Sequence, residues 1–326
     1  MVKTSSLILS IFVLASVSIA SEANDDALFK EAFVQKLNSL STTWKASTKS
    51  RVAQLSTEDF KALINPTGFA HDPRIPTKAF TAAELAAAPA AFDSRENWTH
   101  CASMRQIRDQ SQCGSCWAVS SVETITDRTC IKHGHDVILS AEDMLACSGA
   151  GTCNGGQPYS AFNYWIRSGI VTDECRTYSL PSCDRDYLKN ITNPCPTSRF
   201  PTPTCVRNCT NGKSWEDSKW FGESVYYVNG EQNIMAEIAA NGPVTASFTI
   251  YEDFHFYESG IYRYTSGAYL GGHAVKIIGY GEEDGVKYWI GANSWNEKWG
   301  EKGFFRFIRG INDCGLESYA VAGLAK

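Results

Sequence analysis

The stretch Gln110-Ser-Gln-Cys-Gly-Ser-Cys-Trp-Ala118 decides how the rest of this sequence is interpreted. Cys116 opens a run without glycine or proline in which apolar residues recur at near-helical spacing, so we predict a helix that begins at Cys116. Gly114-Ser115, directly before it, can make the turn and cap the helix. A thiol at a helix N-terminus meets unpaired backbone N–H groups and the positive end of the helix dipole. Both lower its pKa and favour the thiolate, which is the nucleophilic form.

The spacing of Cys113 and Cys116 is also that of a zinc half-site or a disulfide oxidoreductase motif. A zinc site needs a second cysteine or histidine pair at the usual spacing, and none is convincing. A thioredoxin-like motif belongs in an intracellular βαβ context. We therefore predict no metal and no cofactor. An oxidoreductase would show two accessible thiols after mild reduction, whereas a cysteine nucleophile predicts only one reactive thiol.

Composition and the first residues bound the class of protein. The chain has 326 residues, 43% of them apolar, and a net charge of −5, which argues against nucleic acid as a partner. Residues 1–20 have the form of a secretory signal peptide, with Lys3, an apolar middle and small residues at Ser18-Ile-Ala20. The apolar run is short for a membrane anchor, and no later run is long enough to cross a membrane. We expect the secretory pathway, ending in the lysosome or outside the cell.

Residues 21–88 differ from the rest because all twelve cysteines lie at or after Cys101. An apolar stripe predicts a helix from Asp25 to Leu40, and a short helix is expected over Thr57–Ile64. Thr81–Ala91 is alanine-rich and is interpreted as a cleavable linker. The segment has the place and size of a propeptide; the alternative is a small independent domain, for which its apolar content is sparse.

Residues 89–326 are predicted to form an α+β fold with two lobes and a cleft between them, because helical patterns come first and strand patterns second. The predicted helices are 116–130, 141–147, 159–168 and 232–240. The predicted strands are 244–250, 261–264, 274–280, 287–292, 303–308 and 318–322. Between Cys175 and Cys209, five prolines and five cysteines predict a surface loop held by disulfides.

A cysteine nucleophile needs a base, and His273 is the best of the six histidines. Gly271-Gly272 leave its ring approachable, and the alternating run after it predicts a strand that holds it still. The amide oxygen of Asn293 can accept from one imidazole N–H and aim the other nitrogen at the sulfur. Gln110 can hold a developing oxyanion together with the backbone N–H of Cys116.

These motifs resemble the papain-like cysteine proteases, and within them the cathepsin B group. The resemblance covers residue 90 to the end, and the motifs stand in order: Gln-x-x-Cys-Gly-Ser-Cys-Trp, Cys153-Asn-Gly-Gly156, Gly-Gly-His273-Ala and Asn293-Ser-Trp295. His273 and Asn293 lie roughly 160 and 180 residues past the cysteine, beyond the ~130–150 of papain-type chains. The difference fits an insertion at 175–209, where cathepsin B carries its occluding loop. Thr43-Trp-Lys-Ala46 resembles that group's short propeptide.

The resemblance implies a two-lobe papain-like fold with an antiparallel, barrel-like second lobe, and a zymogen that matures into an endopeptidase. It implies that Cys116 is the nucleophile, His273 the base and then acid, Asn293 its orienter and Gln110 part of the oxyanion hole. The substrate-binding residues it implies are Gly155 and Gly156 for the backbone, Trp295 for the leaving-group side, and Ser247 and Tyr319 for the main specificity pocket. The implied partners are peptide and protein substrates, the chain's own propeptide and cystatin-like inhibitors.

The resemblance also implies five disulfides, leaving Cys116 and Cys314 free. The pairs are Cys101–Cys130, Cys113–Cys153, Cys147–Cys205, Cys175–Cys209 and Cys183–Cys195. Glycosylation sequons begin at Asn97, Asn190 and Asn208, of which we favour Asn190.

Two departures from cathepsin B change the expected activity. Asp184-Arg185-Asp186 stands where that group has the histidine pair that binds a substrate's terminal carboxylate, so we expect weak or absent dipeptide release. Tyr319 stands where it has a glutamate, so we expect apolar rather than basic residues in the pocket. The remaining alternative is a catalytically silent binding protein of the same fold.

Overall fold

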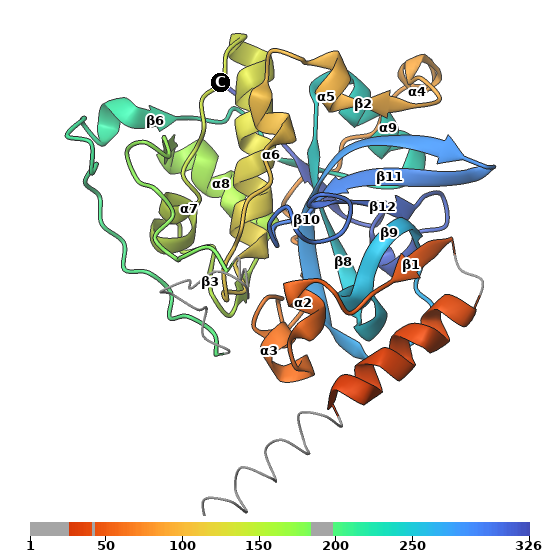
Figure 1. The fold of residues 1–326 in the computed structure, drawn as a ribbon. Helices are drawn as coiled ribbons and strands as arrows, with labels where there is room; N and C mark the ends of the chain where they lie inside the picture. The colour runs from red at the N-terminus through yellow and green to blue at the C-terminus, as the bar shows by residue number, and fades with distance from the viewer. Residues whose placement is uncertain (1–25, 41–42, 184–197) are drawn as a thin grey trace, which may run out of the picture.

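The computed structural model describes residues 26–40, 43–183 and 198–326, which form a helical lobe and a sheet lobe (Figure 1). One hydrophobic core lies within each lobe. The long helix α6 (Cys116–His133) and the long strand β10 (Tyr269–Glu283) meet where the lobes join. The predicted α+β architecture with two lobes is confirmed.

The helical lobe is built around α6, which begins at Cys116 as predicted and is buried over most of its length. The helix ends at Gly134, whose backbone is left-handed with φ of 76°, a conformation that glycine adopts without strain. Ser115 does not cap this helix with its side chain, contrary to the prediction, because its hydroxyl lies 2.8 Å from that of Tyr178. Helices α7 (Ala141–Cys147) and α8 (Pro158–Ser168) pack beside α6.

The sheet lobe contains a nine-stranded sheet in which β10 is central. The strand order is β1-β9-β12-β11-β10-β8-β13-β7, with β2 also paired to β10. Its pairs are antiparallel except for β12 with β9. The strands are β1 (Trp44–Ala46), β2 (Phe92–Asp93), β7 (Tyr226–Val228), β8 (Val244–Tyr251), β9 (Tyr257–Tyr262), β11 (Val286–Ala292), β12 (Phe304–Ile308) and β13 (Ala320–Ala322).

Two predicted strand limits were wrong in a way that matters for the site. Strand β10 starts at Tyr269 rather than at Ala274, so His273 lies inside the strand and pairs with Phe248 of β8. Strand β9 begins at Tyr257, because its tyrosines are buried against the neighbouring aromatic side chains. Helix α9 (Glu231–Asn241) ends before Gly242 as expected.

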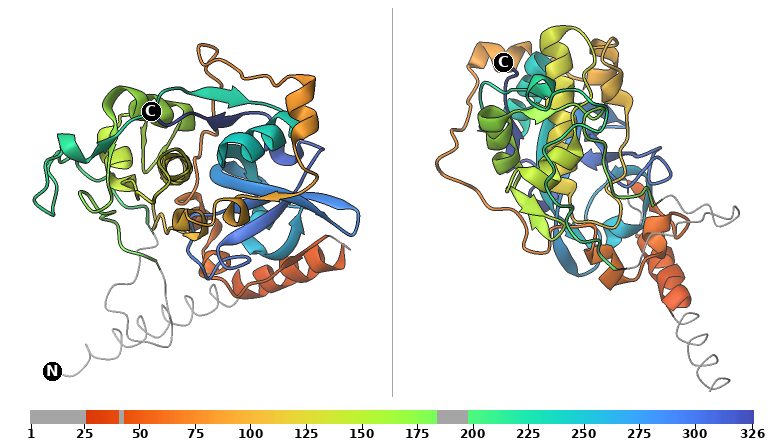
Figure 2. Two further views of the ribbon diagram at one scale, coloured as in Figure 1. Left: turned by 90° about the horizontal axis from the view of Figure 1, so that it is seen from above. Right: turned by 90° about the vertical axis from the view of Figure 1, so that its left-hand side faces the viewer.

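The N-terminal segment, residues 26–88, runs along the sheet lobe and crosses the junction of the lobes (Figures 1 and 2). A helix over residues 26–39 packs on the sheet lobe, and β1 pairs with β9. Helices α2 (Arg51–Gln54) and α3 (Thr57–Lys61) follow. Helix α3 is shorter than predicted, because the backbone of Asn65 instead pairs with Gly272 of β10.

The region interpreted as a cleavable linker, Thr81–Ala91, contains a helix that was not predicted, α4 (Ala82–Ala87). Thr81 and Glu84 form a reciprocal capping box at its start, which satisfies two otherwise unpaired N–H groups. The remaining short elements are α5 (Ser94–Asn97), β3 (Gly151–Thr152), β4 (Gly155–Gly156), β5 (Ile170–Val171), β6 (Lys219–Trp220), η1 (Ala102–Arg105), η2 (Glu216–Ser218), η3 (Glu252–Phe256) and η4 (Asp313–Gly315).

Four of the five expected disulfides are present among the described residues. They join Cys101 to Cys130, Cys113 to Cys153, Cys147 to Cys205 and Cys175 to Cys209. Cys183 is disulfide-bonded, while its expected partner Cys195 lies outside the described residues. Cys116 and Cys314 are free thiols.

Asn97 and Asn208 are exposed, whereas Asn190 lies outside the described residues. None of the helices in the described part of the chain has the length and apolar character needed to cross a bilayer.

Candidate active site

The N-terminus of α6 and the middle of β10 bring Cys116 and the strand residues around His273 to the same place. The side chains of Cys116 and His273 are completely buried. The backbone N–H groups of Ala274, the residue after His273, and of Asn65 face the sulfur of Cys116. The thiol therefore sits between the helical lobe, the sheet lobe and the N-terminal segment.

His273 is oriented by a single strong contact. Its Nε2 lies 2.8 Å from Oδ1 of Asn293, an oxygen that also accepts from the backbone N–H of Ser294. Because an amide oxygen only accepts, Nε2 carries the hydrogen and Nδ1 is left to take a proton. Nδ1 is buried without a hydrogen-bond partner among the described residues. The indole of Trp295 stacks on the imidazole at 4.6 Å between ring centroids and shields this contact from water.

The electrostatics of the thiol differ from the prediction. Burial raises the pKa of Cys116 to about 11, against the opposing effect of the surrounding backbone N–H groups. Burial likewise lowers the pKa of His273 to about 4, although its hydrogen bond to Asn293 acts in the other direction. The expectation of a lowered thiol pKa is wrong for this state, because the N-terminal segment keeps water from the site and loss of solvation penalises both charged forms.

Gln110 has its amide fixed at both ends. Its Nε2 donates to the backbone oxygens of Leu63 and Cys113, at 2.7 and 2.6 Å. Its Oε1 accepts from the hydroxyl of Ser294 at 2.6 Å. The amide N–H groups are thereby turned toward the carbonyl of Leu63, which belongs to the N-terminal segment.

Sequence reasoning missed two residues that support this amide. Ser294 is next to Asn293 in the chain, and that adjacency was the available signal. Tyr178 is partly buried, and its hydroxyl donates to the backbone oxygen of Gln110 at 3.0 Å while contacting Ser115. It lies in the region predicted only as an irregular loop, and nothing in its local pattern pointed to the site.

The N-terminal segment crosses the site in turns on either side of a single β-bridge at Asn65. Asn65 and Gly272 exchange backbone hydrogen bonds of 2.9 and 2.8 Å, and the side-chain amide of Asn65 donates to the oxygen of Gly156. A Cβ on Gly155 would lie 2.4 Å from Oδ1 of Asn65, so only glycine leaves room there. The predicted backbone-binding pair Gly155 and Gly156 thus contacts Asn65 of the N-terminal segment.

Side chains on the helical-lobe side hold the same segment. Arg199 donates from Nη2 to the oxygen of Lys61 at 2.6 Å, and Nε2 of Gln112 donates to that of Asp59 at 2.7 Å. Arg199 stands at the end of the disulfide-held loop, whose residues Asp184-Arg185-Asp186 lie outside the described residues.

A pocket of about 220 Å³ adjoins the site on the sheet-lobe side. Ser247, Tyr319 and the free thiol Cys314 line it, and Phe69 of the N-terminal segment covers part of it. Tyr319 is 45% exposed and packs against His71 with the rings tilted and 4.7 Å between centroids. The pocket offers aromatic and small side chains, and no carboxylate among its described lining.

Within the described residues, one group has the spacing of a metal site: His100, Cys101 and Cys130. The two cysteines form a disulfide, so their sulfurs are not available as thiolate ligands. The chemistry that the site can support is therefore that of a thiol, an imidazole and amide donors.

Comparison with known proteins places this geometry in a family. Residues 88–324 match the family described as "Papain family cysteine protease". The chain is 46% identical to cathepsin B-like cysteine proteinase 6 of Caenorhabditis elegans over 254 residues, covering 73% of this chain and 67% of the relative. It is 41% identical to the gut-specific cysteine proteinase of the same organism, over 96% of each chain.

Solved structures agree with the sequence relatives. ProCathepsin B S9 from Trypanosoma congolense superposes with a TM-score of 0.81 at 33% identity, covering 90% of this chain and 97% of that one. The fold of digestive procathepsin L2 from Tenebrio molitor is also similar, with a TM-score of 0.72 at 24% identity, covering 93% and 90%. The chain belongs to the papain family of cysteine proteases, is cathepsin B-like within it, and is a cysteine-type peptidase.

Proposed function

We propose that this chain is a zymogen in which residues 1–20 are a signal peptide, residues 21–88 a prosegment and residues 89–326 the catalytic domain. One observation carries the proposal: the carbonyl of Leu63 accepts a 2.7 Å hydrogen bond from Nε2 of Gln110 beside the buried thiol of Cys116. The backbone of the N-terminal segment thereby occupies the place where a substrate would be cut. While it stays there, protein substrates are excluded from the thiol.

The proposed chemistry uses Cys116, His273, Asn293 and Gln110. The sulfur of Cys116 attacks the substrate carbonyl carbon, and the thiol proton passes to Nδ1 of His273. The resulting oxyanion is held by Nε2 of Gln110 and the backbone N–H of Cys116. His273 then protonates the leaving amine as the C–N bond breaks, which leaves a thioester on Cys116.

Hydrolysis of the thioester completes the cycle. His273 takes a proton from a water molecule, the resulting hydroxide adds to the thioester carbonyl, and the C–S bond breaks. His273 returns its proton to the departing sulfur, so the acid product leaves and the thiol is restored with one water consumed. Asn293 keeps Nδ1 pointing into the site throughout, and Trp295 protects that hydrogen bond on the leaving-group side.

Titration with a thiol-directed epoxide tests the assignment. After removal of the prosegment, one equivalent should abolish peptide hydrolysis and label Cys116 alone. The catalytically silent alternative predicts no hydrolysis before labelling, and the oxidoreductase alternative predicts label on Cys113 after mild reduction. Labelling at Cys113, or full activity after Cys116 is labelled, would overturn the proposal.

We further propose that the specificity pocket prefers apolar or aromatic residues. Tyr319 cannot compensate the lost solvation of an arginine, and Phe69 already rests against the pocket in the zymogen. A Phe-Arg substrate should be cleaved at least about tenfold more efficiently than an Arg-Arg substrate. Equal kcat/KM values for the two would contradict this.

Endopeptidase action with weak or absent dipeptide release is proposed from the sequence of the loop. Asp184 and Asp186 would repel a terminal carboxylate, leaving Arg185 as the sole cation of that triplet. Paired peptides with free and amidated carboxyl ends measure this directly, and efficient dipeptide release from the free acid alone would contradict it. We also propose lysosomal or extracellular delivery, sugar on Asn97, Asn190 or Asn208, and inhibition by cystatin-like proteins.

A further inference from the structure

Beyond the cleft, the N-terminal segment makes a second, separate set of contacts at the far edge of the sheet. Residues 76–78 pair with Tyr227 of β7, which is the end strand of the nine-stranded sheet. The backbone N–H of Lys78 donates to the oxygen of Tyr227, and the N–H of Tyr227 donates to the oxygen of Pro76, both at 2.8 Å. These contacts extend the sheet by a short parallel segment, which is how sheet edges commonly bind peptides.

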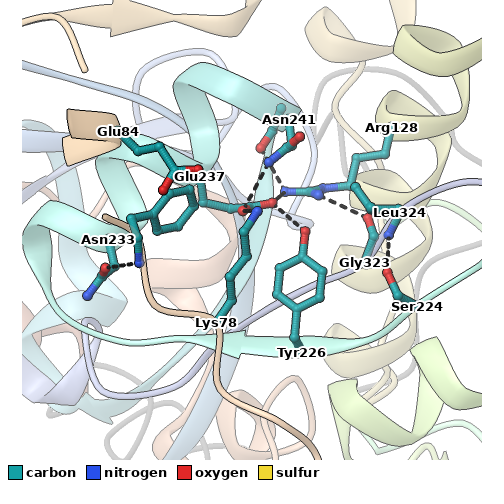
Figure 3. A network of polar contacts seen from close by, with 12 residues as sticks. Lys78, Glu84, Arg128, Ser224, Tyr226, Asn233, Glu237, Asn241, Gly323 and Leu324 are labelled. Carbon is teal, nitrogen blue, oxygen red and sulfur yellow. Dashed lines mark hydrogen bonds and ion pairs between the residues drawn. The ribbon is translucent and has the colours of Figure 1, made fainter. Parts of the chain in front are cut away.

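The side chain of Lys78 reaches a carboxylate behind this edge. Its Nζ lies 2.8 Å from Oε2 of Glu237 on α9, as Figure 3 shows. The ammonium also lies 4.5 Å from the ring centroid of Phe80 and 5.1 Å from that of Tyr226. Asn233 accepts from the backbone N–H of Phe80 at 3.3 Å. The domain thus recognises this lysine by the charge of Glu237 and the aromatic face of Tyr226, while Phe80 of the segment itself also covers the ammonium.

Residues of the catalytic domain alone hold the carboxylate of Glu237 in place. Glu237 is 0% exposed, and its Oε1 accepts from Arg128 at 2.9 Å and from the hydroxyl of Tyr226 at 2.8 Å. Asn241 donates to Oε2 at 3.1 Å. Although burial alone would raise it, Arg128 and Lys78 hold the pKa of Glu237 below its usual value. The acceptor is therefore charged and preformed.

Arg128 is itself held from several sides. It donates to the backbone oxygens of Gly242, Pro243 and Gly323 as well as to Glu237. All of these partners lie in residues 89–326, so they stay in place when the prosegment leaves. Lys78 is then the one partner of Glu237, among those described, that is lost.

We infer that the mature protein has a second peptide-binding site, formed by the edge of β7 and the buried carboxylate of Glu237, for an extended segment with a lysine facing Glu237 and an aromatic residue two positions later. This inference rests on the proposed zymogen organisation. The ligand we commit to is the chain's own residues 72–82 after excision. The site binds them without using Cys116, His273 or the specificity pocket, so the excised piece stays associated with an open cleft.

The test uses the matured protein with Cys116 blocked by the epoxide, so that the peptide cannot enter the reaction. A fluorescently labelled peptide of residues 72–82 should bind saturably by anisotropy. Exchanging the lysine in that peptide, Lys78→Met, should weaken binding at least about thirtyfold, because the peptide then loses its ion pair with the buried carboxylate of Glu237. The matched control is Thr77→Ser, an exposed position of the same peptide, which should bind as the parent does.

Changing the peptide instead of the protein keeps folding out of the comparison. An unlabelled peptide of residues 58–69, which spans the cleft contacts, should fail to compete. Equal binding of the Lys78→Met peptide, absence of saturable binding, or competition by the 58–69 peptide would each overturn the inference. Failure of the proposed catalysis would appear in the epoxide titration, which is independent of this binding curve.

Discussion

Two stretches of the N-terminal segment bind the same domain in different ways. Residues 61–65 lie in the cleft and are held mainly through their backbone, by Gln110, Gly272 and Arg199. Residues 76–80 lie on the edge of β7, and their contacts include the charged side chain of Lys78 on Glu237. The cleft contacts are made mainly to backbone groups and select little among side chains, whereas the edge contacts recognise a particular residue.

The groups beneath the two stretches differ as well. In the cleft, Nδ1 of His273 has no hydrogen-bond partner among the described residues, and burial disfavours both the thiolate of Cys116 and the imidazolium. At the edge, both oxygens of Glu237 are satisfied. In the cleft, a group that lacks a hydrogen-bond partner remains able to bond to a substrate. At the edge, the hydrogen bonds to both oxygens of Glu237 hold its carboxylate in one position.

The largest expected effect is a loss of catalysis while the N-terminal segment stays bound in the cleft. Cys116→Ser should lower kcat/KM for a peptide substrate by at least about 10⁴-fold, because a neutral hydroxyl is a far weaker nucleophile. Both stretches should remain docked, since neither needs the sulfur, and the zymogen's melting temperature should be nearly unchanged. Retention of more than a percent of the activity would contradict the nucleophile assignment.

Alkylation measures what the cleft stretch does to the thiol. With its pKa raised to about 11, Cys116 is neutral at pH 6, and iodoacetamide should react at least about 1000-fold more slowly in the zymogen than after maturation. Mass spectrometry of the modified peptides distinguishes Cys116 from Cys314. Lys78→Met in the zymogen should change this rate by less than about threefold, and a larger acceleration would mean that the two stretches do not act separately.

Gln110→Ala tests the donor that holds the carbonyl of Leu63. In the mature protein kcat should fall by about 10²–10³-fold with little change in KM, because the lost hydrogen bond stabilises the transition state more than the bound substrate. Tyr178→Phe keeps the ring and deletes the hydroxyl that fixes the backbone of Gln110, so a smaller loss of about tenfold is expected. A change confined to KM in either variant would assign these residues to substrate binding alone.

The smallest expected effect is on the pH dependence of stability. It comes from Glu123, a buried carboxylate that lacks the hydrogen-bond partners of Glu237. Neither of its oxygens has a hydrogen bond among the described residues, and burial raises its pKa to about 7 against the attraction of Lys276 and Arg108, with Asp127 adding to the rise. A raised folded-state pKa means that the folded protein binds more protons than the unfolded chain between about pH 4.5 and 7. Stability contributed by the protonated group is therefore lost as the pH rises through this range.

Thermal unfolding at several pH values measures this loss. The melting temperature should fall by roughly 5 °C between pH 5 and pH 8, and Glu123→Gln should flatten that decline, because glutamine stays neutral. Glu237→Gln is the contrasting change and should destabilise the fold at both pH values, since Arg128 would lose its charged partner. An unchanged slope in Glu123→Gln would assign the pH dependence to other groups.

Several residues show how much of the fold and of the site could be predicted from the sequence. The start of α6 at Cys116 and the end of α9 before Gly242 followed from helix periodicity and a glycine stop, which are local properties. The glycines before His273 and the position of Asn293 singled out these side chains, and the structure joins them at 2.8 Å. By contrast, the helix α4 inside the segment interpreted as a cleavable linker was not predicted, because the Thr81–Glu84 capping box was overlooked.

The sequence by itself therefore determined local properties. These are the residue types, the limits of helices, and the spacing along the chain of Cys116, His273 and Asn293. Only the tertiary structure decided that Leu63 reaches Gln110, that Tyr178 holds the backbone behind it, and that Lys78 lies on Glu237. It also reversed the expected pKa of Cys116, because burial depends on which distant segment covers the sulfur. Solvation and long-range pairing are properties of the folded surface, and no window of neighbouring residues contains them.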